Sequence, residues 1–252
     1  MNTGNLKGKG ALITGASQGL GREMALALAA AGAEVILLAR QAAPLEETAR
    51  AARALGAVAH VFPADVTNET QIARVAESVL QKMPAPHILI NNAGMNIRKP
   101  LIEFSLAEWR QVMDTNLTSV FLICRHFVPH MKGRGYGRVI NMTSIMSHIS
   151  LPGRSAYSAS KAALLGLIRA LALELAPDRI TVNGISPGPF ATEMNRPLLD
   201  NPELNAQFLA KIPLGSWGDP KDIGQLALFL CSEHADFITG TDIVVDGGWT
   251  AQ

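Results

Sequence analysis

A glycine-rich loop near the N-terminus places the strongest constraint on the fold of this chain. Gly15, Gly19 and Gly21 separate an apolar run at 10–13 from a helical run of Ala and Leu at 24–29. A loop between a strand and a helix presents backbone N–H groups and the positive end of the helix dipole to an anion, and glycine lets that anion come close. Ordinary left-handed turns, which glycine also serves, are the alternative. The spacing favours a strand–loop–helix unit that can hold a pyrophosphate.

Apolar runs alternate with helical patterns along the rest of the chain. The pattern predicts strands at 11–14, 34–39, 58–63, 88–91, 137–141, 180–185 and 242–245, and helices near 22–31, 44–55, 69–82, 106–131, 155–176 and 220–231. Several strands are continuously apolar, which is typical of parallel strands covered on both faces. We expect an α/β fold in which residues 1–252 form a single domain, a doubly wound parallel seven-stranded sheet of the Rossmann type.

Composition excludes several functional classes. Hydrophobic residues make up 48% of the 252 residues and charged residues 17%, which favours a large buried core over disorder. The formal net charge is +1 and no basic run occurs, so we expect no nucleic-acid or membrane partner. The polar N-terminus lacks the apolar core of a secretory signal, and we expect a cytoplasmic protein.

Cysteine and histidine usage gives no sign of a disulfide framework or a metal site. Cys124 and Cys231 are the only cysteines and are more typical of buried small apolar residues. His126 and His130 stand four residues apart, a spacing that suits a metal ion, but no third ligand is evident. We therefore expect no metal.

Tyr157 and Lys161 form the clearest catalytic pattern. They lie four residues apart in a helical segment and so share a helix face. A cation beside a phenol lowers a pKa that is otherwise about 10, which predicts Tyr157 as a general acid and base. Ser144 follows the strand at 137–141, where its hydroxyl can donate to a carbonyl oxygen that gains negative charge. A chance pair on a solvated helix and a turn-forming serine are the alternatives.

These motifs, with Asn91-Asn92-Ala93-Gly94 between them, resemble the short-chain dehydrogenase/reductase family over essentially the whole chain. The resemblance implies a catalytic tetrad of Asn116, Ser144, Tyr157 and Lys161, in which Asn116 holds a water linked to Lys161. It also implies a set of cofactor-binding positions: Gly15, Ser17, Gly19, Leu20, Gly21, Arg40, Asp65, Val66, Asn92, Ala93, Gly94, Tyr157, Lys161, Pro187, Gly188 and Thr192.

The end of the second predicted strand indicates NADP rather than NAD. By resemblance, NAD-preferring members of the family carry an acidic residue where Ala39 stands, to bond the free ribose 2′-hydroxyl. Arg40 follows and can supply a planar cation to a 2′-phosphate, although a solvated arginine is the alternative. The resemblance further implies that Asp65 bonds the adenine and that Thr192 holds the nicotinamide carboxamide.

The reaction implied by the resemblance interconverts a secondary alcohol and a ketone. The segments 94–100 and 187–195 are similar to those of family members that act on sugar acids, such as gluconate 5-dehydrogenases. Arg98 and Arg154 could bind a substrate carboxylate, with His148 as a third pocket candidate; solvated surface groups are the alternative for each. A 3-oxoacyl-(acyl-carrier-protein) reductase or a general carbonyl reductase is the second interpretation.

Two alternatives belong to other functional classes: a catalytically silent nucleotide-binding regulatory protein, and a structural oligomer. The intact tetrad argues against both. Residues 187–218 carry five prolines and are expected to form an irregular substrate lid at the carboxyl edge of the sheet. The resemblance also implies a homotetramer built through 106–131, 155–176 and the C-terminal strand.

Overall fold

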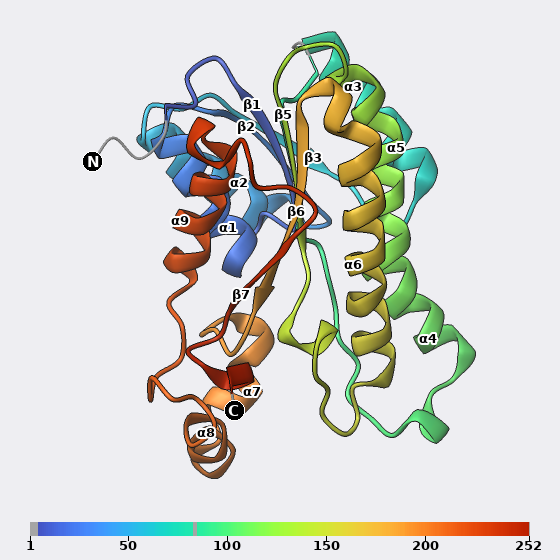
Figure 1. Cartoon of the computed structure of the whole chain (residues 1–252), viewed down its shortest axis with the longest axis vertical. Helices are drawn as coiled ribbons and strands as arrows, with labels where there is room; N and C mark the ends of the chain where they lie inside the picture. The colour runs from blue at the N-terminus through green and yellow to red at the C-terminus, as the bar shows by residue number, and fades with distance from the viewer. Residues whose placement is uncertain (1–4, 83–84, 252) are drawn as a thin grey trace.

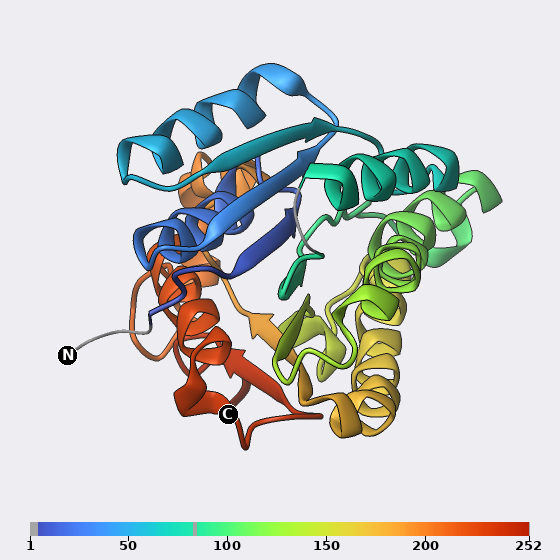
Figure 2. The same ribbon diagram turned by 90° about the horizontal axis from the view of Figure 1, so that it is seen from above.

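A seven-stranded parallel sheet forms the centre of the molecule (Figures 1 and 2). The computed structural model describes residues 5–82 and 85–251. The strands are β1 (Gly10–Thr14), β2 (Glu34–Ala39), β3 (Ala59–Pro63), β4 (Ile88–Asn91), β5 (Gly137–Met142), β6 (Ile180–Pro187) and β7 (Asp242–Val245). Their order is β3-β2-β1-β4-β5-β6-β7. The order reverses between β1 and β4, which is the point where ligands bind in doubly wound folds, and the predicted fold class is confirmed.

Helices cover both faces of the sheet. They are α1 (Gly19–Ala30), α2 (Ala42–Ala54), α3 (Glu69–Lys82), α4 (Leu106–Met113), α5 (Ser119–Met131), α6 (Ser155–Leu175), α7 (Arg196–Leu199), α8 (Pro202–Leu209) and α9 (Pro220–Cys231). In Figure 1, α1, α2 and α9 lie on one side of the sheet, and α3, α5 and α6 lie on the other. The view from above in Figure 2 shows the same two layers.

The alternation of side chains along β1 explains why the strands are continuously apolar. Ala11 and Ile13 pack into one hydrophobic cluster together with residues of α1 and α9. Leu12 between them points to the opposite cluster, which contains residues of α3, α5 and α6. All three are fully buried. Successive strand residues face opposite sides of a sheet, so a strand with helices on both sides needs apolar residues at every position.

The segment predicted as a helix at 106–131 is helical from Leu106 to Met131, and it contains one π-helical segment. A π-helical segment at Asp114–Thr118 separates α4 from α5. Asn116 lies inside this segment, and its carboxamide bonds the backbone of Met95 with both of its polar atoms. Helices accommodate an extra residue in this way where a side chain is held at a functional position.

The segment 187–218 is more regular than its prolines suggest. Pro197 and Pro202 stand in the first turns of α7 and α8, where proline is tolerated because its missing N–H is not needed. Asn201 caps α8 by accepting from the amides of Glu203 and Leu204, each at 3.1 Å. The expectation of an irregular segment is therefore wrong for these stretches.

Within residues 5–82 and 85–251, no helix combines the length and the apolar character that crossing a bilayer requires. Over the same ranges, no group of three or more His, Cys, Asp or Glu residues is arranged to hold a metal ion. Cys124 and Cys231 are buried and free.

Candidate active site

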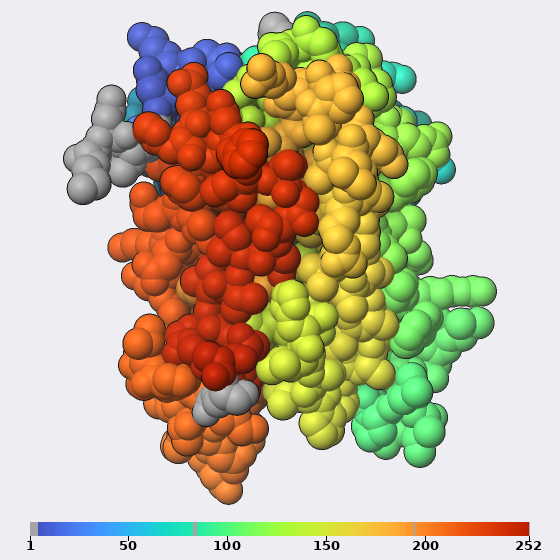
Figure 3. All heavy atoms as spheres, in the orientation of Figure 1, coloured from blue at the N-terminus to red at the C-terminus, as the bar shows by residue number. Residues whose placement is uncertain are grey.

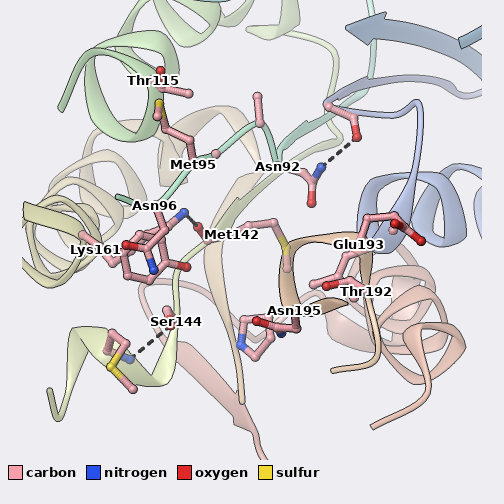
Figure 4. A pocket seen from close by; sticks show the side chains of 18 of the residues that line it. Asn92, Met95, Asn96, Thr115, Met142, Ser144, Lys161, Thr192, Glu193 and Asn195 are labelled. Atoms are coloured by element: carbon pink, nitrogen blue, oxygen red, sulfur yellow. Dashed lines mark hydrogen bonds between the residues drawn. The ribbon is translucent and has the colours of Figure 1, made fainter. Parts of the chain in front are cut away.

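One cavity of about 800 Å³ opens at the carboxyl ends of the strands. It is lined by nearly all the site residues predicted from sequence, which come from the ends of β1 to β6 and from α6: Gly15, Ser17, Gly19, Leu20, Arg40, Asp65, Val66, Asn92, Ala93, Gly94, Arg98, Ser144, Arg154, Tyr157, Lys161, Pro187, Gly188 and Thr192. Figure 4 shows Lys161 and Ser144 on one side of the cavity and Thr192 and Asn195 on the other. Gly21, Asn116 and His148 do not line it.

The glycine loop is held rigidly against the end of β4. Gly15 and Gly19 have positive φ angles of 64° and 55°, which L-residues with side chains rarely adopt. Asn92 Nδ2 donates to the carbonyls of Thr14 at 2.9 Å and Gly15 at 3.1 Å (Figure 4). Thr14 Oγ1 accepts from the backbone amides of Asn92 at 2.9 Å and Ala93 at 3.0 Å. The loop and the end of β4 thus form one unit.

Gly21 serves packing rather than the cavity lining expected for a cofactor contact. A Cβ atom at this position would lie 2.3 Å from the carbonyl oxygen of Gly15 and 2.4 Å from Asn92 Nδ2. Such distances are shorter than van der Waals contact allows. Glycine is required here because α1 begins directly against the loop.

Asn116 acts as a tie between the loop after β4 and the catalytic turn of α6. Its Oδ1 accepts from the amide of Met95 at 2.8 Å. Its Nδ2 donates to the carbonyl of Met95 at 2.9 Å and to Ser160 Oγ at 3.0 Å, and Ser160 in turn donates to the carbonyl of Tyr157 at 2.7 Å. The side chain is buried and positions Tyr157 indirectly. The water that the resemblance implies at Asn116 stays a prediction.

The ammonium group of Lys161 reaches the end of β5. Its Nζ donates to the carbonyl of Met142 at 2.5 Å and lies 5.8 Å from the centroid of the Tyr157 ring. Burial lowers the pKa of Lys161 to about 8. This ammonium is therefore close to losing its charge just above neutral pH.

The charges that favour the Tyr157 phenolate come from two arginines. Burial raises the pKa of Tyr157, and a hydrogen bond with Ser144 and the charges of Arg154 and Arg98 lower it. Lys161 Nζ is bound to the Met142 carbonyl, and its role as the cation that lowers the pKa of Tyr157 stays a prediction. The pattern of spacing along α6 carries no information about arginines that arrive from outside the helix.

Arg98 and Arg154 form a cationic wall beside Tyr157. Burial and the nearby charge of Arg98 lower the pKa of Arg154 to about 10, and burial also lowers the pKa of Arg98. Arg98 Nη2 donates to Asn195 Oδ1 at 3.3 Å, and Asn195 Nδ2 donates to the carbonyl of Phe190 at 3.0 Å. Two like charges that share one cavity repel each other, and an anionic ligand relieves that repulsion.

His148 does not reach the cavity, so its prediction as a pocket residue is wrong. It follows the 3₁₀ turn Ile145–Ser147, and its Nε2 lies 2.6 Å from Asp242 Oδ2 on β7. The imidazole thus contacts β7, outside the residues that line the cavity. Its side chain is 36% exposed.

Comparisons with known proteins agree with this arrangement. A family model described as "Enoyl-(Acyl carrier protein) reductase" matches residues 15–250. The chain is 36% identical over 246 residues to the gluconate 5-dehydrogenase of Gluconobacter oxydans, with 98% of this chain and 96% of that protein covered. The chain belongs to the short-chain dehydrogenase/reductase family. It is accordingly an oxidoreductase that acts on CH–OH groups.

Two further relatives of this short-chain dehydrogenase/reductase differ in their substrates. The 3-oxoacyl-[acyl-carrier-protein] reductase of Aquifex aeolicus is 36% identical over 247 residues, with 96% of this chain and 98% of that protein covered. The crystal structure of a gluconate 5-dehydrogenase from Burkholderia cenocepacia, in complex with NADP and tartrate, superimposes with a TM-score of 0.94 at 33% identity, and the match covers both chains fully.

An aromatic wall completes the cavity of this short-chain dehydrogenase/reductase. Phe208 of α8 and Trp217 are stacked, with ring centroids 5.7 Å apart and planes at 9°. Trp249 lies 5.4 Å from Phe208, and all three rings line the cavity. The sequence gives one signal for this wall, which is the concentration of large aromatic residues within and after the predicted lid. Their proximity depends on the return of the chain through β7.

Proposed function

We propose that this enzyme interconverts a secondary alcohol and a ketone on a substrate that bears a carboxylate, with NADP(H) as its cofactor. Sugar acids such as gluconate and its 5-keto form are the proposed substrate class. The observation that carries this proposal is the pair of guanidinium groups of Arg98 and Arg154, which line the cavity and act electrostatically on Tyr157. A carboxylate bound by this pair would hold the substrate in the cavity that Tyr157 also lines. The gluconate 5-dehydrogenase relatives support the same class.

The cavity fits a phosphorylated dinucleotide. Gly15 and Gly19 add no side chain to the cavity that they line, and a Cβ at Gly19 would come into van der Waals contact with Thr192 at 3.6 Å. Arg40 lines the cavity and is exposed, so its guanidinium can bind a 2′-phosphate. The neighbouring residue, Ala39, has no carboxylate that would repel this phosphate. Bound there, the cofactor supplies hydride to the carbonyl carbon or accepts it from the alcohol.

We propose that the cavity-lining residues contact the cofactor as the family resemblance implies. Gly15, Ser17, Gly19 and Leu20 would hold the pyrophosphate; Arg40, Asp65, Val66, Asn92, Ala93 and Gly94 the adenosine half; and Tyr157, Lys161, Pro187, Gly188 and Thr192 the nicotinamide half.

The chain's own groups then handle the proton and the charge. Ser144 donates a hydrogen bond to the substrate oxygen, whose negative charge grows during reduction. Tyr157 gives its proton to that oxygen in reduction and removes it in oxidation. Arg98 and Arg154 favour the phenolate that results, and Lys161 adds a buried positive charge next to β5. Asn116 keeps the catalytic turn of α6 against the loop after β4.

A 3-oxoacyl-(acyl-carrier-protein) reductase is the second candidate. It is favoured by the relative from Aquifex aeolicus and by the aromatic wall of Phe208, Trp217 and Trp249, which would suit an apolar acyl chain. The two candidates differ in the partner of the arginines, because a sugar acid carries a carboxylate and an acyl thioester does not. A silent nucleotide-binding protein would have no use for Ser144 and Tyr157 in one cavity.

A substrate panel tests the proposal. Oxidation of NADPH is followed by absorbance with 5-keto-gluconate, a neutral ketone of similar length and an acetoacetyl thioester. We expect the highest kcat/KM with 5-keto-gluconate. A higher value with the thioester would select the second candidate, and no turnover of any ketone would contradict both.

Arg154→Ala is expected to raise KM for the sugar acid by at least about tenfold while it changes KM for a neutral ketone by less than about twofold, because only the charged substrate loses a charge-assisted hydrogen bond. Arg98→Ala should act in the same direction. The control is Arg169→Ala, which removes an exposed guanidinium of α6 outside the cavity lining. An equal rise in KM for the charged and the neutral substrate would contradict the proposal that the arginines bind a substrate carboxylate.

We further propose a homotetramer. Large apolar side chains lie exposed on the helices expected to form interfaces: Phe121 of α5 is 51% exposed and Leu173 of α6 is 80% exposed. Phe237, which precedes β7 in the chain, is fully exposed. Figure 3 shows the surface of α6 next to that of the C-terminal segment with α9 and β7. Such side chains favour burial against a partner. Light scattering should give about 107 kDa, four times the chain mass of 26.8 kDa; a monomer at micromolar concentration would contradict this.

Three further assignments complete the proposal. Residues 1–252 act as one cofactor-binding domain, because one sheet carries every part of the cavity. Residues 187–218 act as the substrate lid, since Asn195 and Phe208 from this segment meet Arg98 and Trp249 across the site. The location is cytoplasmic, which two buried free cysteines support.

A further inference from the structure

The side chain of Asp242 extends from β7 across β6 to the end of β5, next to the active site. Asp242 is paired with Gly184 in the register of β7 and β6. A Cβ at Gly184 would lie 2.1 Å from Asp242 Oδ1, so the carboxylate occupies the space that a side chain on β6 would fill. The missing side chain lets Asp242 extend over β6 to the end of β5, and its side chain is 9% exposed.

Three side chains hold this carboxylate. Thr143 Oγ1 lies 2.5 Å from Asp242 Oδ1, and Ser186 Oγ donates to Oδ2 at 2.6 Å. His148 Nε2 lies 2.6 Å from Oδ2 and closes the network at the surface. Thr143 and Ser186 are buried. A carboxylate removed from water is stable only when its oxygens are satisfied by such bonds, so the network is well defined in geometry.

The network braces the ends of β5 and β6 where they enter the cavity. Thr143 directly precedes Ser144, and its backbone amide donates to the carbonyl of Ile185 at 2.9 Å. Ser186 directly precedes Pro187, which lines the cavity. The carbonyl of Met142, one residue before Thr143, accepts from Lys161 Nζ. The backbone around Ser144 is therefore held from α6 on one side and from β7 on the other.

We propose that Asp242 is a positioning residue for the oxidoreductase reaction, which acts through Thr143 to aim the Ser144 hydroxyl at the substrate oxygen next to Tyr157. The proposal depends on the family reaction and is independent of whether the substrate is a sugar acid. The reaction rate is sensitive to the position of this hydroxyl, because a displacement of about 1 Å in a reacting group can lower the rate roughly 100-fold. Loss of Asp242, which only supports the position of Ser144, is expected to lower the rate less than loss of the Ser144 hydroxyl itself.

Asp242→Ala is expected to lower kcat about tenfold, and Thr143→Val, which keeps the side-chain shape, should lower it to a similar degree. The assay is NADPH oxidation with whichever ketone of the panel is reduced fastest, so failure of the sugar-acid proposal leaves this test intact. If Asp242→Ala does not fold, Thr143→Val decides the outcome alone. Unchanged kcat in the folded variants would overturn the proposal.

A matched control separates positioning from stability. Asp236 pairs with Arg138 at the opposite end of β5, and Arg138 is buried. Asp236→Ala should lower the melting temperature while kcat stays within about twofold of the parent enzyme. If Asp236→Ala lowers kcat as much as Asp242→Ala does, the effect of Asp242 is only a loss of stability.

A double-mutant cycle tests the route through Ser144. In the Ser144→Ala background, single-turnover rates should change by less than about twofold when Asp242→Ala is added, because the hydroxyl that Asp242 aims is already absent. An undiminished tenfold loss in that background would show that Asp242 does not act through Ser144, and would overturn the proposal.

Discussion

Tyr157→Phe is expected to lower kcat by at least about 100-fold and to change the affinity for NADPH by less than about twofold. The substitution keeps the partly buried ring in place and removes the one hydroxyl that transfers a proton in the proposed reaction, and general acid–base catalysis supplies rate factors of about 10² to 10⁴. The ring stays packed because Tyr157 contacts the cluster of Ile145, Met146 and Trp249.

The measurement combines steady-state kinetics with a fluorescence titration of NADPH. Tyr136→Phe is the matched control, since Tyr136 is the only other tyrosine and its hydroxyl donates to the carbonyl of Cys231 at 2.5 Å, outside the cavity lining. It should lose stability and keep its turnover. Retained activity in Tyr157→Phe would refute the assigned acid.

The second large effect concerns the cofactor. The enzyme should prefer NADP over NAD by at least about tenfold in kcat/KM, equivalent to about 1.4 kcal/mol. Arg40 lines the cavity and is exposed, so its guanidinium can meet a 2′-phosphate without the cost of burying a charge. Ala39→Asp with Arg40→Ile should reverse the order, since the new carboxylate would accept from a 2′-hydroxyl and repel a phosphate.

Kinetics with both cofactors at one fixed ketone concentration check this reversal, in which the ratio of the two kcat/KM values should move by about 100-fold. Arg50→Ile on α2 is the control, because Arg50 is exposed but does not line the cavity. Equal use of NADP and NAD by the unaltered enzyme would show that Arg40 does not read the phosphate.

The fold was accessible from sequence because its strongest signals are local. Each strand is a short apolar run, and Gly15 and Gly19 mark the turn where β1 passes into α1. The predicted bounds of β2, β4, β7, α3 and α9 match the structure. Among the bounds that differ from the prediction, α1 begins at Gly19 rather than 22, and β6 runs on to Pro187, where it pairs with β7.

The parts of the site that escaped prediction depend on contacts between distant residues. Asn116 lies in the π-helical segment and is held by Met95, 21 positions earlier. His148 is drawn to Asp242, 94 positions later. The spacing of Tyr157 and Lys161 places them on one helix face but says nothing of the Met142 carbonyl that takes up the ammonium. Periodicity reports which residues share a face, and not which partner each one finds.

The tight fit at Gly21 limits how this enzyme can change its cofactor. Any side chain at this position would collide with Gly15 and with the Asn92 amide that joins the loop to β4, so a variant of the loop disturbs the fold together with nucleotide binding. At the end of β2, by contrast, a substitution of Arg40 can change nucleotide binding without disturbing the fold, because this side chain is exposed. Selection for a different nucleotide, in nature or in the laboratory, therefore has room to work at Ala39 and Arg40 and very little room in the loop itself.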